Sequence, residues 1–96
     1  MTLGVIATIT VVEGKNQEFE SVFSDLAKQV LSQEPGVLLY ALHRSKSKPQ
    51  VYKVMEQYRS AQDLKVHQQT DYFLAANKAL ASVVAAAPEI ELLDVV

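Results

Sequence analysis

The sequence predicts a single soluble α+β domain, a four-stranded antiparallel sheet with helices on one face in the ferredoxin-like arrangement. The 96 residues suffice for one domain and leave no room for a second, so residues 1–96 form one unit. The apolar pattern alternates between the strand and helix periods in the order β-α-β-β-(α)α-β, the order of this fold. Several strands are apolar on both faces, which predicts a sheet face that no helix covers.

The first strand and the first helix are marked by a change of period. Residues 3–12 are rich in Val, Ile and Thr at odd and even positions alike, which is typical of a strand buried on both faces. Gly14 ends this run, and Pro35-Gly36 ends the helix that follows because neither residue continues a helix. The apolar stripe of this helix consists of Phe19, Val22, Phe23, Leu26, Val30 and Leu31.

The remaining strands are predicted from alternation and composition. Residues 37–44 and 51–58 alternate, and the polar segment between them predicts a hairpin with a loop longer than a two-residue tight turn. Residues 89–96 are rich in Ile, Leu and Val and predict the last strand.

Two N-caps mark the helices between the hairpin and the last strand. Ser60 is a favourable N-cap with Asp63 in the capping-box position, and Thr70-Asp71 predicts a second cap. We expect the second helix to continue through the alanine run before Pro88. Its apolar stripe consists of Phe73, Ala76, Ala79, Leu80, Val83 and Val84.

The uncovered sheet face predicts a homodimer. Val5 and Ile6 fall on opposite faces of the first strand, and Leu42 and Leu39 fall on opposite faces of the hairpin, so both faces carry apolar side chains. An apolar sheet face without a helix is an interaction surface. The same sheet of a second copy is the simplest cover, and two-fold symmetry is the commonest arrangement.

Composition excludes several classes of function. The net charge is −2 and the nine Lys and Arg residues are scattered, so we expect no nucleic-acid partner and no attraction to a membrane. The absence of cysteine excludes a disulfide framework and a cysteine nucleophile, and two distant histidines predict no metal site. The chain has neither a signal-peptide layout nor the ~20 apolar residues of a membrane span, so we expect a cytoplasmic protein.

His67 is the first candidate catalytic residue. It lies near the end of a short predicted helix, where the simpler interpretation is a surface or capping histidine favoured by the helix dipole. The functional interpretation is a proton carrier at the mouth of a cavity, because imidazole titrates near neutral pH.

Glu56 is the second candidate catalytic residue. It shares its strand face with Tyr52, Val54 and Tyr58, and a carboxylate on such a face is costly unless it is paired. The simpler interpretation is an ion pair with a nearby Lys or Arg, or exposure on a sheet edge. The functional interpretation is a carboxyl group with a raised pKa, or a group that orients His67.

Four aromatic residues are candidate substrate-binding groups, because ligand pockets favour aromatic side chains. For Phe73, core packing is the simpler interpretation at this helical spacing, and we expect His43 to be exposed beside Arg44. The four residues are Tyr40, Tyr58, Tyr72 and Phe73.

The chain resembles the antibiotic biosynthesis monooxygenase family nearly from end to end. The most specific part is a Glu56-x-Tyr58 strand followed nine residues later by His67 and then by Tyr72-Phe73. The other matching pieces are Val12-Glu13-Gly14-Lys15, Glu34-Pro35-Gly36, Tyr40-Ala41-Leu42 and Thr70-Asp71-Tyr72-Phe73.

The resemblance implies a homodimeric α+β barrel with one pocket per subunit between sheet and helices. It places Glu56, Tyr58, His67 and Phe73 at or beside that pocket. The haem-degrading branch of the family is a poor match, because the chain has no Trp and offers Ala7-Thr8 where that branch has an Asn. The missing Trp also weakens a transfer from the aromatic polyketide oxygenases.

The expected function is therefore a monooxygenase without metal or cofactor that oxidises a small quinol or phenolic substrate with dioxygen. One alternative is an isomerase of a small carbonyl metabolite, with or without a phosphate group. Another is a non-catalytic ligand-binding or stress-response dimer. Convergence of Glu56 and His67 on one cavity would favour the enzymes, since catalysis requires both groups to reach one ligand.

Overall fold

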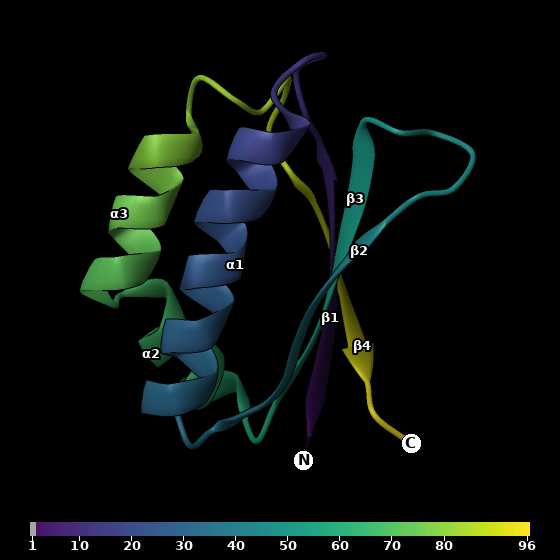
Figure 1. Cartoon of the computed structure of the whole chain (residues 1–96). Coiled ribbons are helices and arrows are strands. Elements are labelled where there is room, and N and C mark those ends of the chain that lie inside the picture. The colour runs from purple at the N-terminus through teal and green to yellow at the C-terminus, as the bar shows by residue number, and fades with distance from the viewer. Residues whose placement is uncertain (1) are drawn as a thin grey trace.

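The computed structural model describes residues 2–96, which form one four-stranded sheet and three helices (Figure 1). The strands are antiparallel and lie in the order β2-β3-β1-β4, with all three helices on one face. This confirms the predicted ferredoxin-like α+β fold. The elements are β1 (Leu3–Thr10), α1 (Asn16–Gln33), β2 (Val37–Arg44), β3 (Val51–Tyr58), α2 (Ala61–Gln68), α3 (Asp71–Leu80) and β4 (Glu89–Asp94).

The core lies between α1 and the sheet. The buried positions of α1 belong to the predicted stripe, and Phe19 and Val30 have no exposed surface. The Phe19 ring lies 4.7 Å from the Tyr52 ring, and the Phe23 ring stacks on Tyr40 at 5.6 Å between centroids. These aromatic contacts fasten α1 to the central strand β3 and its neighbour β2.

The turn after α1 sits against the start of α2. A Cβ atom at Gly36 would collide with the side chain of Asp63, so this approach requires glycine. Asp63 is itself fixed, because its backbone N–H donates to Ser60 Oγ at 3.2 Å and its carboxylate accepts from the same hydroxyl at 2.7 Å. The predicted N-cap at Ser60 is confirmed, and the close contact brings the C-terminal end of α1 beside α2.

Helix α3 begins at the predicted cap but ends before the predicted residue. Thr70 Oγ1 accepts from the backbone N–H of Phe73 at 3.3 Å. The helix stops at Leu80, and the expectation that it continues through the alanine run is wrong. The backbone N–H of Val12 donates to Val83 at 2.8 Å, and Val83 is buried. The chain therefore leaves the helix after Leu80, so that Val83 is buried and its backbone pairs with the residues that follow β1.

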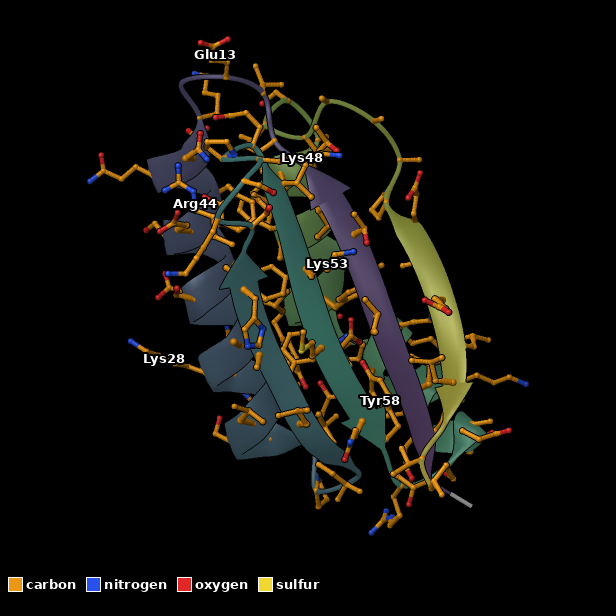
Figure 2. The ribbon with its side chains drawn as sticks, turned by 90° about the vertical axis from the view of Figure 1, so that its right-hand side faces the viewer. Glu13, Lys28, Arg44, Lys48, Lys53 and Tyr58 are labelled. Atoms are coloured by element: carbon orange, nitrogen blue, oxygen red, sulfur yellow. The ribbon has the colours of Figure 1, made fainter. Side chains whose placement is uncertain are left out.

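The helix-free face of the sheet is turned toward the viewer in Figure 2, where Lys53 projects from it. Its apolar side chains are partly exposed, with Leu39 at 37%, Met55 at 38% and Leu93 at 38%. Ile6 lies beside Met55 in the register and is only half-buried. The expectation that the first strand is buried on both faces is therefore wrong for the single chain, in which only the helix-facing side of β1 is covered.

Strand β4 is the exposed edge of the sheet. It pairs with β1, and all six of its residues are exposed. Ile90 and Leu92 lie on the helix-facing side but are 59% and 61% exposed, because the helices pack mainly on the rest of the sheet. No helix within residues 2–96 is long and apolar enough to cross a membrane.

Candidate functional site

A cavity of about 510 Å³ lies between the sheet and the helices. Its walls come from the helix-facing side of the sheet and from all three helices, and Ile90 and Leu92 form its β4 edge. Most of the lining is apolar, which is typical of a small-molecule site. The polar lining residues are Tyr40, Glu56, His67, Gln68 and Asn77.

Glu56 lies at the centre of a row that crosses the sheet. In the strand register it pairs with Tyr40 of β2 on one side and with Val5 of β1 on the other. Directly paired residues on one face have Cβ atoms about 5 Å apart, so the Tyr40 and Glu56 side chains lie next to each other. Glu56 Oε1 accepts a hydrogen bond of 2.5 Å from the Tyr58 hydroxyl.

Burial changes the acidity of Glu56. The side chain is 9% exposed, and burial raises the pKa of its carboxyl group to about 7, although the hydrogen bond from Tyr58 acts in the opposite direction. The carboxyl group therefore changes charge within the physiological pH range. The interpretation of Glu56 as an ion-paired or edge-exposed carboxylate is wrong, because β3 is an interior strand and no cation lies within salt-bridge distance of it among residues 2–96.

His67 is held by a buried carboxylate, that of Glu34, the residue that follows α1. Its Nδ1 lies 3.1 Å from Glu34 Oε2, and the Tyr72 hydroxyl donates to the same oxygen at 2.6 Å. His67 is 2% exposed, so the interpretation as a surface or capping histidine is wrong. Phe73 and Tyr40 pack on the imidazole, with centroids 4.5 and 5.2 Å from it.

The contact with Glu34 determines which ring nitrogen of His67 faces a ligand. A carboxylate accepts hydrogen bonds, so in the neutral imidazole Nδ1 carries the proton and Nε2 carries the free lone pair. Nε2 makes no hydrogen bond within residues 2–96. Every side-chain nitrogen or oxygen there that is fully buried does have a hydrogen-bond partner, so Nε2 cannot be fully buried. Nε2 is therefore open to the cavity that His67 lines.

Four of the six predicted site residues line this cavity, and the other two lie outside its lining. Glu56 and His67 both line it, and so do Tyr40 and Phe73. The hydroxyl of Tyr58 supports Glu56 from outside the lining. Tyr72 also lies outside the cavity and bonds to Glu34, whereas His43 is exposed as expected.

Glu34 is a residue of the site that was not among the candidates predicted from the sequence. The sequence places it just before Pro35-Gly36, where it reads only as the end of a helix. Its partner His67 is 33 residues away, so no local spacing connects them. The hypothesis that Glu56 orients His67 is wrong, because the carboxylate bonded to His67 Nδ1 is that of Glu34. The one signal in the sequence was the Glu34-Pro35-Gly36 segment itself.

The sequence profile of the antibiotic biosynthesis monooxygenase family matches residues 2–79, and the chain belongs to this family of small α+β proteins. A search of curated proteins gave no match. Within residues 2–96, no group of three or more His, Asp or Glu side chains is placed to hold a metal ion.

Solved structures share this fold. A candidate antibiotic biosynthesis monooxygenase from Caulobacter crescentus CB15 is 52% identical, with a TM-score of 0.96 over 99% of this chain and 90% of that one. A protein from Pseudomonas aeruginosa is 27% identical, with a TM-score of 0.89 over 99% and 94%. A candidate antibiotic biosynthesis monooxygenase from Nitrosomonas europaea shares the fold at 20% identity and a TM-score of 0.92, over 96% and 88%.

Proposed function

We propose that the protein is a cofactor-independent monooxygenase that oxidises a small quinol or phenolic substrate with dioxygen. The arrangement of His67 supports this most strongly, because Nδ1 is bonded to buried Glu34 while Nε2 is open to an apolar cavity. A carboxylate–imidazole pair of this kind can act as a general base. Membership of the family supports the reaction class, although a fold alone does not determine an activity.

The proposed chemistry begins with proton transfer from a substrate hydroxyl to His67 Nε2. Glu34 stabilises the imidazolium that forms, and the mostly apolar lining limits the contact of the resulting anion with water. The electron-rich anion transfers one electron to dioxygen, and the two radicals combine to form a C–O bond. Cleavage of the O–O bond then leaves one oxygen atom on the ring and releases the other as water. The quinol supplies all the electrons, so quinol and dioxygen give a hydroxyquinone and water.

Oxygen uptake tests the proposal. Chelator-treated protein would be added to a panel of quinols and phenols in an oxygen electrode. The masses of the products would be measured by mass spectrometry. We expect accelerated uptake on a subset of the panel, with one oxygen atom gained per dioxygen consumed. Rates equal to those in buffer for every member would contradict the proposal.

The isomerase alternative is favoured by one observation, that an acidic and a basic group line the same cavity. Glu56 and His67 could move a proton between carbons next to a carbonyl group. Such a reaction consumes no dioxygen, so the same electrode separates the two activities.

The pH dependence of kcat/KM should reflect the ionisation of the Glu56 carboxyl group. Protonated Glu56 can donate a hydrogen bond to the substrate oxygen, whereas ionised Glu56 repels the developing anion. We therefore expect kcat/KM to fall as the pH rises through about 7, and Glu56→Gln to remove this fall. A fall that persists unchanged in Glu56→Gln would exclude Glu56 as its cause.

The same ionisation makes folding stability depend on pH. Because the pKa of Glu56 is raised from 4.5 to about 7 in the folded chain, its carboxyl binds more protons when folded than when unfolded. Glu56 therefore lowers the free energy of unfolding as the pH rises between these two values, and Glu56→Gln should remove this loss in urea titrations.

We further propose that the protein is a homodimer joined through the helix-free face, as the sequence predicts. The exposed apolar side chains Leu39, Met55 and Leu93 on that face support this. Sedimentation at micromolar concentration should give twice the 10.6 kDa mass of the chain, and Met55→Glu should shift the protein to the monomer. Lys46→Glu, in the hairpin loop, is the matched control. A wild-type species of 10.6 kDa alone would overturn the dimer.

A further inference from the structure

The ionisable groups around the cavity have an unusual balance of charge. Glu56 lines the cavity directly, and the carboxylate of Glu34 lies immediately behind the imidazole of His67. Both carboxyl groups are buried. The cavity lining contains no Lys or Arg side chain within residues 2–96. Within residues 2–96, one carboxyl group therefore lines the cavity and a second lies directly behind its wall, whereas His67 is the only lining group that can become a cation.

Several cations of the chain are held elsewhere. Arg44 is the last residue of β2, where it donates to Pro49 O at 3.0 Å and lies 3.8 Å from Glu20 of α1. Arg59 pairs with Asp63 at 3.3 Å. Lys53 donates to a threonine on the helix-free face of the sheet at 3.1 Å, and Figure 2 shows it pointing away from the helices. These contacts do not direct a positive charge into the cavity.

The uncharged polar groups at the cavity are suited to a neutral ligand. The Tyr40 hydroxyl makes no hydrogen bond within residues 2–96 and, by the argument applied to Nε2, it is open to the cavity. The amides of Gln68 and Asn77 complete the polar lining. Neutral donors of this kind can bind a hydroxyl or carbonyl oxygen, but a buried anion also needs an opposite charge.

We propose that the cavity selects substrates without a negative charge, so that it accepts uncharged aromatic alcohols and carbonyl compounds and rejects their carboxylated, sulfonated or phosphorylated analogues. This selection rests on the proposed function, because the same residues carry out both. A neutral phenol that gives its proton to His67 leaves an ion pair in the cavity and no change in net charge. An incoming anion instead adds a negative charge next to Glu56 and Glu34.

The selection also bears on the isomerase alternative. A phosphorylated carbonyl compound would carry its negative charge into the cavity beside the carboxyl groups, where no Lys or Arg would face it. Only an unphosphorylated carbonyl compound is compatible with this wall. The charge rule therefore narrows the substrate class whichever reaction takes place.

Binding of a matched pair of ligands tests this without requiring turnover. 2-Naphthamide and 2-naphthoate have nearly the same shape and differ in charge, and the chain has no Trp to obscure naphthalene fluorescence. Titrations would be run at pH 8, where Glu56 is mainly ionised. We expect the anion to bind about tenfold or more weakly than the amide, since like charges in a site of low dielectric repel strongly.

Two variants should change the preference in a defined direction. Glu56→Gln removes one negative charge and should narrow the difference between the ligands. Asn77→Lys places a cation on an exposed position of α3 that lines the cavity, and should strengthen binding of 2-naphthoate while leaving 2-naphthamide nearly unchanged. Asn77→Gln is the control of matched size without charge.

The outcomes separate this inference from the proposed function. Equal or tighter binding of the anion by the wild type overturns the charge selection and leaves the oxygenase proposal standing. Selective binding of the amide, together with no oxygen uptake on neutral quinols, supports the selection and contradicts the oxygenase. Failure of both ligands to bind overturns the selection. The selection is also overturned if Glu56→Gln and Asn77→Lys both keep the wild-type preference for 2-naphthamide over 2-naphthoate.

Discussion

Replacing His67 with alanine is expected to lower kcat on an active quinol by about 100- to 10,000-fold, the range that a positioned general base contributes. The imidazole provides an accepting Nε2 in the cavity, and no other neutral nitrogen base lines it within residues 2–96. Free imidazole added to the His67→Ala protein should restore part of the rate, because the deletion leaves space of the same shape.

The second histidine of the chain provides the control for this experiment. His43 is exposed on β2, and its ring bonds only to the backbone of Ala41 at 3.2 Å. His43→Ala should retain the wild-type rate. A His67→Ala protein that is folded by circular dichroism and turns over quinol at the wild-type rate would remove His67 from the mechanism.

Replacing Glu34 with glutamine is expected to lower kcat by about 100-fold or more, although Glu34 does not line the cavity. A carboxylate can only accept from Nδ1, whereas an amide can donate to it. The amide therefore allows the tautomer in which Nε2 carries the hydrogen and no longer accepts a proton from the substrate. Nitrogen-15 NMR of the His67 ring measures this tautomer directly, with His43 as the internal reference.

Glu20 provides a matched control for Glu34→Gln. It also accepts a hydrogen bond from a tyrosine hydroxyl, that of Tyr52, but it lies in the N-terminal half of α1 and outside the cavity lining. Glu20→Gln should leave the rate and the His67 tautomer unchanged. If Glu34→Gln also leaves both unchanged, then Glu34 does not position the imidazole.

The regular elements were predictable because their periodicity is local. The two hairpin strands begin and end at the predicted residues, since alternation over eight residues reports directly on the faces of a sheet. The end of α3 was not predictable in this way. Alanine has a high helix propensity, but Val83 is buried against the end of β1, a tertiary contact that the sequence pattern does not contain.

The candidate site was predictable only in part. His67 and Glu56 could be proposed from residue type and family resemblance, and they do line one cavity. The role of Glu34 depends on how closely the end of α1 approaches α2, and Gly36 permits this approach because a Cβ atom there would collide with Asp63. A contact between residues so far apart in sequence follows from the fold, so no spacing rule could have identified it.

The most direct test of the proposed proton transfer is the ionisation state of a bound phenol. The absorption spectrum of 2-naphthol would be recorded without oxygen, at a pH at which the free compound is un-ionised, before and after adding the protein. If His67 takes the proton, the naphtholate band should appear with the wild type and be absent with His67→Ala. Saturable binding of 2-naphthol to the wild type with a wholly un-ionised spectrum would contradict the role of His67 as the base.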